Sequence, residues 1–388
     1  MSTAPGSSTT PGISTTLGTS KQLAQPVTYD PAYEIAEPDE QQTIQALVST
    51  LQSISDVTAR DSGHGYRSVH IKSHGLLRGK LTVAPGLPPE LKQGIFADEQ
   101  VYETVIRLST SPGDFLADSV STPRGLALKV IGVQGERLQG DAAAQTQDFL
   151  LVSGQSFVNK DAKSFLSGLK LLAKTTNRFP EFKKVISSVL RGLTRLLASL
   201  GIESATLKAM GGYPETHILG EQFFTQVPVL YGPYMAKLSV RPASPGLLAL
   251  AGKHLNSNGL NTRDNPDALR QAVNAFFATH AGQWEVLVQL CRNLDTMPIE
   301  DAAVVWPEHE SPYLKVATID VAPQKAWDDK LTPPIEDKLA FSPWNGIAAH
   351  RPLGSVMRAR KLTYQHSSNF RRQMNGCPMH EPQSTEQL

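Results

Sequence analysis

Short segments in which apolar and polar positions alternate, each bounded by turn residues, follow one another between Tyr66 and about Val158. They are Ser68–Lys72, Gly79–Val83, Tyr102–Leu108, Gly125–Ile131 and Asp148–Val152. Successive short strands joined by turns pair in an antiparallel fashion. This part of the chain is therefore predicted to form antiparallel sheet.

The period becomes helical from Ala162 to Leu200, where apolar residues recur at helical spacing on both sides of Pro180. Two amphipathic helices are predicted there. Their polar side carries Lys183, Lys184, Arg191 and Arg195. These helices either pack as a plain layer on the sheet or line a route for amphipathic molecules.

The second half of the chain combines both patterns. Strands are predicted at Gln222–Pro228, Met235–Arg241 and Tyr313–Val321. Asn265 with Pro266 is typical of the start of a helix. The segment from Val356 to about Arg372 lacks Gly and Pro and predicts a C-terminal helix. The elements together indicate an α+β fold.

The two ends of the chain are polar. Residues 1–25 are rich in Ser, Thr, Pro and Gly and cannot bury enough apolar surface to offset the entropy of ordering, so a disordered tail is predicted. Residues 26–376 contain no repeat or long linker and are predicted to form one domain, and residues 377–388 form a polar tail. The sequence lacks a secretory signal pattern, so a cytoplasmic location is expected.

Composition excludes several classes of function. The 388 residues include 37 Lys and Arg against 36 Asp and Glu, a formal net charge of +1, which disfavours a general binder of nucleic acid. The chain has no apolar run of the roughly 20 residues that a transmembrane helix needs. Cys291 and Cys377 are too few for a disulfide framework or a four-cysteine zinc site, and favour a reducing compartment.

His70 and His74 have a spacing that also occurs in metal sites. In a strand this spacing only places both side chains on the same side, and no third ligand is spaced to join them. From periodicity alone, His70 is more simply a surface or hydrogen-bonded histidine on an antiparallel strand.

The predicted C-terminal helix carries a second group of candidate site residues. Arg360, Tyr364 and Arg371 fall on one stripe, with a guanidinium one turn before a phenol. A nearby fixed positive charge favours the phenolate, and tyrosinate is one of the known ligands of haem iron. Such a stripe also occurs on solvated arginine-rich helices, so the pattern alone leaves both interpretations open.

Several segments in the same order resemble the haem catalases. Arg67–Lys72 resembles the Arg-x-Val-His-Ala-Lys strand that carries the catalytic histidine of that family. The match continues through Arg107–Thr110, Asp118-Ser119, Pro123–Lys129, Trp306-Pro307, Phe341–Asn345 and Arg360-x-x-x-Tyr364. Within the superfamily, the short chain and Trp344-Asn345 before Ala349–Pro352 are most similar to the small catalase-related haem peroxidases of bacteria.

This resemblance implies a catalase-type antiparallel β-barrel with inserted and C-terminal helices that binds haem b. It implies that His70 is the distal acid–base group and Ser109 its hydrogen-bond partner. Tyr364 would be the axial iron ligand, supported by Arg360. Further haem contacts would come from Val69 and from Arg67, Arg107 and Arg371, the three arginines holding the propionates.

Two features of the alignment affect the expected site. A regular strand would place Arg67 opposite His70, so the backbone there is expected to turn or bulge. If Asp148 and Asp161 align without a gap, Phe165 packs on the distal face of the haem. The distal asparagine of catalases then falls on Val152, with Ser153 beside it, and neither offers an amide donor.

The implied activity is peroxide reduction with a small-molecule reductant and weak dismutation. Losing one orienting hydrogen bond costs about 1–3 kcal/mol, roughly one or two decades in rate, and dismutation is the more sensitive reaction. Hydrogen peroxide and organic hydroperoxides are both expected substrates, and the helices before Leu200 could admit amphipathic ones. Catalase relatives are commonly oligomeric, so a homo-oligomer is also compatible.

Two alternatives remain from the sequence. One is an enzyme that rearranges fatty-acid hydroperoxides, similar to coral allene oxide synthase. In that enzyme a threonine precedes the distal histidine, whereas Val69 precedes His70 here, which favours the peroxidase. The other is a haem carrier or sensor, which would need no His70 with a Ser109 partner.

Overall fold

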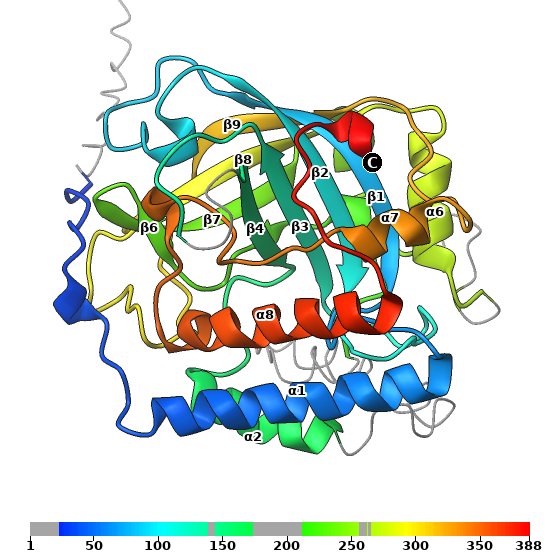
Figure 1. Cartoon of the computed structure of the whole chain (residues 1–388). Helices are drawn as coiled ribbons and strands as arrows, with labels where there is room; N and C mark the ends of the chain where they lie inside the picture. The colour runs from blue at the N-terminus through cyan, green and yellow to red at the C-terminus, as the bar shows by residue number, and fades with distance from the viewer. Residues whose placement is uncertain (1–22, 139–143, 174–211, 256–261, 263–264) are drawn as a thin grey trace, which may run out of the picture.

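The computed structural model describes residues 23–138, 144–173, 212–255, 262 and 265–388, and its centre is a closed antiparallel sheet (Figure 1). The strands are β1 Ser73–Val83, β2 Val101–Thr110, β3 Arg124–Ile131, β4 Thr146–Val152, β5 Phe223–Phe224, β6 Val229–Tyr231, β7 Tyr234–Pro242, β8 Gly282–Leu290 and β9 Leu314–Val321. They form a nine-stranded sheet in the order β5-β4-β3-β2-β1-β9-β8-β7-β6. Because β5 pairs with both β4 and β7, the sheet closes into a barrel, with β6 attached to β7 outside the ring. The predicted barrel is confirmed.

Alternation along the strands fills the barrel with apolar side chains. Leu77 and Leu81 of β1 and Trp284 of β8 belong to one large buried cluster that runs through the barrel. Burying such side chains is worth about 25 cal/mol for each Å² of apolar surface removed from water. The barrel is therefore a packed support whose strand ends can hold a site in fixed geometry.

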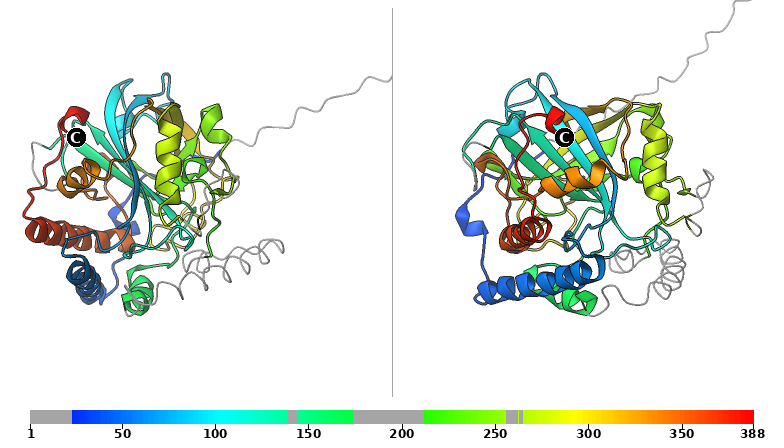
Figure 2. Two further views of the ribbon diagram at one scale, coloured as in Figure 1. Left: turned by 90° about the vertical axis from the view of Figure 1, so that its right-hand side faces the viewer. Right: turned by 45° about the vertical axis from the view of Figure 1, so that its right-hand side comes forward.

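The longer helices lie on one side of the barrel. The helices are α1 Glu40–Ser62, α2 Ala162–Ala173, α5 Pro245–Leu248, α6 Ala268–Phe277, α7 Thr332–Lys338 and α8 Ser355–Asn375. Helix α8 lies between the barrel and α1 in all views (Figures 1 and 2). Leu47 of α1, Leu166 of α2 and Ala359 of α8 belong to one apolar cluster, which joins the three helices.

The structure corrects several sequence predictions. Ser68–Lys72 is not a strand, because β1 begins only at Ser73. The strand predicted at Gln222–Pro228 is reduced to the two residues of β5, and α6 begins after Asp267 and not after Asn265. Helix α1 and strand β8 were not predicted.

Other predictions lie partly outside the described residues. The disordered tail at 1–25 lies almost wholly outside them, as does the second of the two helices predicted up to Leu200. The C-terminal tail at 377–388 is polar, as predicted, but it packs against the barrel. Glu381 Oε2 accepts hydrogen bonds from Lys129 Nζ at 2.6 Å and Asn345 Nδ2 at 3.1 Å.

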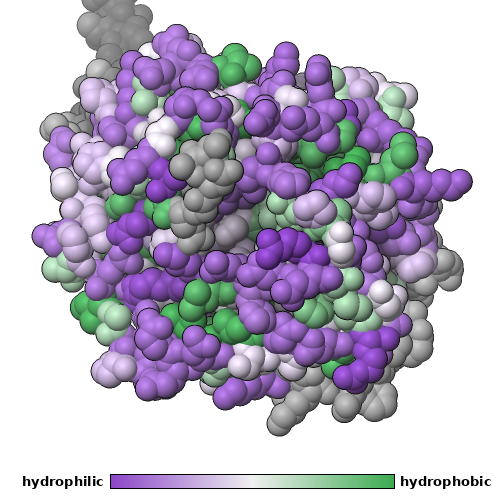
Figure 3. All heavy atoms as spheres, in the orientation of Figure 1, coloured by the Kyte–Doolittle hydropathy of each residue, from purple (hydrophilic) through white to green (hydrophobic). Residues whose placement is uncertain are grey.

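The face in Figure 3 is mostly hydrophilic, and its apolar side chains form small scattered patches. Among the described residues, no helix is both long and apolar enough to cross a membrane.

Candidate active site

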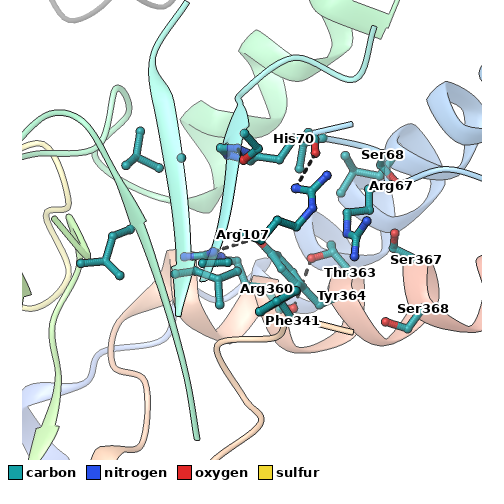
Figure 4. A pocket seen from close by; sticks show the side chains of 18 of the residues that line it. Arg67, Ser68, His70, Arg107, Phe341, Arg360, Thr363, Tyr364, Ser367 and Ser368 are labelled. Carbon is teal, nitrogen blue, oxygen red and sulfur yellow. Dashed lines mark hydrogen bonds between the residues drawn. The ribbon is translucent and has the colours of Figure 1, made fainter. Parts of the chain in front are cut away.

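A pocket with a volume of about 100 Å³ lies between the barrel and helix α8 (Figure 4). Its walls come from the loop before β1, from β2, β3 and β4, and from one face of α8. Most of the site residues predicted from the sequence line this pocket.

The loop that carries His70 turns sharply. The φ angle of His70 is 53°, in the left-handed region that non-glycine residues seldom adopt. The His70 N–H donates to the carbonyl oxygen of Ser111 at 2.9 Å, and Arg107 Nη1 donates to the His70 carbonyl at 3.0 Å. Because of this turn, Arg67 and His70 both line the pocket, which a strand would not allow.

Ser109 of β2 fixes the imidazole ring of His70. The distance from His70 Nδ1 to Ser109 Oγ is 3.0 Å. Burial lowers the pKa of His70 to about 3, and the positive charges of Arg107 and Arg360 add to the effect. The ring is therefore neutral near pH 7, and Nε2 is the nitrogen that Ser109 does not contact.

Helix α8 brings Tyr364 to the pocket together with Arg360. Arg360 Nη2 donates to Tyr364 Oη at 2.7 Å, and the guanidinium carbon lies 4.9 Å from the centroid of the phenol ring. A charge-assisted hydrogen bond of this length stabilises negative charge on the oxygen. The pair thus places in the pocket a phenol oxygen that accepts a hydrogen bond from a guanidinium group.

Three arginines that line another part of the pocket contact Glu336, two through its carboxylate and one through its backbone carbonyl. Glu336 of α7 accepts from Arg107 Nε at 2.9 Å and from Arg67 Nη1 at 3.4 Å. Arg371 Nη2 donates to the backbone carbonyl of Glu336 at 2.8 Å. Within this contact set, three positive groups face one negative group.

Burial and the neighbouring positive charges lower the pKa values of two of these arginines. Burial, followed by the charge of Arg107, lowers the pKa of Arg371 to about 10. Burial, followed by the charge of Arg371, lowers the pKa of Arg67 well below its usual range. A ligand that brings carboxylates to this cluster would relieve the repulsion.

The end of strand β4 presents an apolar wall. Val152 lines the pocket, and none of the described pocket-lining residues is an asparagine or glutamine. Ser153 is not among these lining residues, because its Oγ accepts a hydrogen bond from the backbone N–H of Arg124 at 2.9 Å. The pocket wall therefore offers no side-chain amide beside His70 within the described part of the chain.

Two predicted features lie elsewhere. Phe165 of α2 does not line the pocket; its ring packs against Phe157 at a centroid distance of 5.2 Å. His74 is buried in β1 and is also outside the pocket, with Nε2 3.3 Å from Thr110 Oγ1. Among the described residues, no group of three or more His, Cys, Asp or Glu side chains could hold a metal ion.

Some pocket residues were not identified from the sequence. Ser367 and Ser368 of α8 lie three and four residues after Tyr364, so helical spacing could have placed them on its face. Glu336, which does not line the pocket but contacts Arg107, carried no such signal, because it is 229 residues from Arg107 in sequence. Leu51 was missed together with helix α1.

Comparison with known proteins bears on the fold. No protein-family model matches the sequence, and no curated protein matches it. The structure is similar to a fungal catalase, with a TM-score of 0.58 and 17% identity over 82% of this chain and 61% of that one. It is also similar to catalase A from Saccharomyces cerevisiae (TM-score 0.56, 15% identity, 90% of this chain and 67% of that one). A bacterial catalase gives a TM-score of 0.55 and 15% identity, covering 90% of this chain and 63% of that one.

These similarities establish a catalase-type fold. The chain spans 61% of the length of the fungal catalase, so it is considerably shorter than that protein. At this level of identity the roles of individual residues rest on the geometry of the pocket.

Proposed function

We propose that this protein is a haem-dependent peroxidase that reduces hydrogen peroxide or organic hydroperoxides and has weak catalase activity. The observation that carries the proposal is the presence of two pairs in one pocket, His70 with Ser109 and Arg360 with Tyr364. The first pair can move a proton, and the second can supply an oxygen ligand for a metal. Their occurrence in a barrel with the fold of catalases supports peroxide chemistry.

The pocket residues fit haem b in three ways. Tyr364 supplies a phenol oxygen that is already hydrogen-bonded to a guanidinium group. The surplus positive charge around Glu336 suits the carboxylates of the porphyrin, which Arg67 and Arg371 would bind. Val69, Leu126 and Val152 provide apolar surface for the ring itself.

Bound haem supplies the iron chemistry that reduces the O–O bond of a peroxide. Tyr364 would hold the metal through its phenol oxygen, which accepts a hydrogen bond from Arg360. His70 would accept the proton of the near peroxide oxygen and pass it to the far oxygen, which would leave as water from hydrogen peroxide or as an alcohol from an organic hydroperoxide. Because burial lowers the pKa of His70, the imidazole is neutral near pH 7 before the proton is transferred.

Val152 supports peroxidase over catalase chemistry. Dismutation requires a second peroxide to be oriented beside His70, and the described pocket wall has no side-chain amide to orient it. An aromatic electron donor can react at the edge of the cofactor and does not need that amide. We therefore assign a small aromatic reductant as co-substrate, and a reducing, cytoplasmic setting in which Cys291 and Cys377 stay unpaired.

The test is a direct comparison of two activities in one haem-loaded preparation. Peroxide-dependent oxidation of an aromatic dye is expected to be substantial, with oxygen release far slower. Oxygen release as the main reaction would contradict the peroxidase assignment, and failure to bind haem would contradict the whole proposal. Conversion of a fatty-acid hydroperoxide without any reductant would instead identify a rearranging enzyme.

A further inference from the structure

Arg107 differs from the other two arginines of the cluster in how its guanidinium group is used. Its Nε donates to Glu336 Oε1 at 2.9 Å, Nη1 to the His70 carbonyl at 3.0 Å and Nη2 to the Ile71 carbonyl at 3.3 Å. All three nitrogen atoms therefore have acceptors within the protein, and the side chain is only 3% exposed. Through Glu336, Arg107 links helix α7 to the loop that carries His70. Figure 4 shows Arg107 beside His70.

This loop depends on such contacts because it has little regular structure of its own. Ser68–His70 forms a bend outside any strand, and His70 holds a left-handed φ of 53°. Its N–H is bonded to Ser111, while its carbonyl receives the Arg107 hydrogen bond. The direction of the imidazole follows from this backbone conformation, so whatever fixes Arg107 also fixes the ring.

Glu336 supplies the negative charge that fixes Arg107. The carboxylate is buried, and its contact with Arg107 is shorter than its contact with Arg67, 2.9 Å against 3.4 Å. Arg67 and Arg371 place further positive charge nearby. Without the carboxylate, a buried Arg107 would be repelled by these neighbours and lose the partner of its Nε.

We propose that Glu336 is a positioning residue for His70, acting through Arg107 on the backbone of residues 68–72. Arg107 is thereby assigned to hold the His70 loop, which leaves Arg67 and Arg371 to bind the carboxylates of a cofactor. The catalytic consequence rests on the proposed peroxidase function, whereas the structural link between Glu336 and His70 is independent of it. The test is therefore made first on cofactor-free protein.

Hydrogen exchange of the full chain without haem measures the link directly. In Glu336→Gln, the amides of residues 68–72 are expected to exchange at least about tenfold faster than in the wild type, since a buried charge pair is lost. The matched control is Asp337→Asn, which makes the same charge change on the same helix. Asp337 contacts His64 and Asn375 and not Arg107, so exchange at residues 68–72 should stay at the wild-type rate.

Arg107→Lys provides a second variant in case Glu336→Gln folds poorly. Lysine keeps the charge beside Glu336 but lacks the planar fork that reaches three acceptors at once, so the same local loss of protection is expected. Wild-type protection of residues 68–72 in either variant would overturn the proposal. Faster exchange spread evenly over the barrel would also overturn it, because it would indicate a general role in stability.

The haem-loaded protein gives a second readout. The rate of reaction with peroxide should fall at least roughly tenfold in Glu336→Gln, with the KM for the dye unchanged, and Glu336→Asp should restore part of the rate. An unchanged peroxide rate would contradict the positioning role. If the wild type takes up no haem, the proposed function fails, and the exchange experiment still decides the role of Glu336.

Discussion

The backbone of Gly125 lies directly against the imidazole ring of His70. A Cβ atom at residue 125 would come within 2.6 Å of the ring atoms Nδ1 and Cε1, closer than real Cβ contacts occur. It would also lie 2.8 Å from Ser109 Oγ. Glycine on β3 is thus what allows the His70–Ser109 pair to sit against the barrel wall.

Gly125→Ala is therefore expected to displace the His70 ring and slow the reaction with peroxide by roughly 10- to 100-fold, because small shifts of a catalytic group are costly. Stopped-flow measurement of the haem-loaded variant checks this. Gly168→Ala on α2 is the control, since a Cβ there meets no atom within 4 Å. The control should keep the wild-type rate and gain up to about 1 kcal/mol of helix stability. A wild-type rate in Gly125→Ala would remove the argument for a tightly held ring.

His70→Ala should bind haem and yet react with peroxide at least roughly 100-fold more slowly, the usual contribution of general acid–base catalysis. The same stopped-flow assay measures the effect. His366→Ala is the control, because His366 is exposed on α8 and contacts Gln52, away from the pocket. A peroxide rate close to that of the wild type in His70→Ala would exclude His70 as the proton shuttle.

Val152→Asn should raise oxygen release from hydrogen peroxide and leave dye oxidation nearly unchanged, since the amide would orient a second peroxide beside His70. An oxygen electrode and a dye assay on one preparation measure both rates. Ser153→Asn serves as the control, because Ser153 lies outside the pocket lining. If the unmodified protein already releases oxygen as fast as dye is oxidised, the missing amide does not limit dismutation.

His350 should make the protein less stable in acid. Its Nε2 accepts from the Ile95 N–H at 3.1 Å, and burial lowers the pKa of His350 from 6.5 to about 4. Between these values the unfolded chain binds more protons than the folded one, so the free energy of unfolding falls as pH drops below about 6.5. Urea unfolding of cofactor-free protein at pH 7 and pH 5 measures this loss.

In His350→Gln the loss between pH 7 and pH 5 should be smaller by about 2 kcal/mol, because an amide can replace the hydrogen bonds without titrating. The exposed His309 provides the control variant His309→Gln, which should show the wild-type pH dependence. Equal losses in His350→Gln and the wild type would show that His350 does not titrate with folding.

The antiparallel sheet could be predicted from short β-type runs bounded by turn residues, and the barrel from the resemblance to catalases. Strands β2 and β3 are buried along nearly their whole length, so alternation alone would not have identified them. The prediction of a strand at Ser68–Lys72 was wrong. Apolar and polar residues alternate there, but the segment is a loop that long-range contacts with Ser111 and Arg107 hold in place. The need for a turn between Arg67 and His70 was nevertheless visible from strand geometry. Helix α1 was missed although Ile44, Leu47 and Ile54 recur at helical spacing.

Contacts in the candidate site could be predicted where both residues lie on the same helix. Arg360 and Tyr364 are one helical turn apart, so their contact follows from local geometry. Phe165 depended on an alignment across a loop, and the structure places its ring against Phe157 and not on the pocket wall. Glu336 reaches Arg107 only through the packing of α7 on the barrel, and no local pattern encodes such a contact.

The absorption spectrum of the haem-loaded protein, compared between the wild type and Tyr364→Phe, tests the central claim most directly. The wild type should show ferric haem with a tyrosinate ligand, and Tyr364→Phe should lose that spectrum and most of the bound haem. Tyr234→Phe, on the hairpin of β6 and β7 and outside the pocket, should match the wild type. An unchanged spectrum and haem content in Tyr364→Phe would contradict the assignment of Tyr364 as the iron ligand.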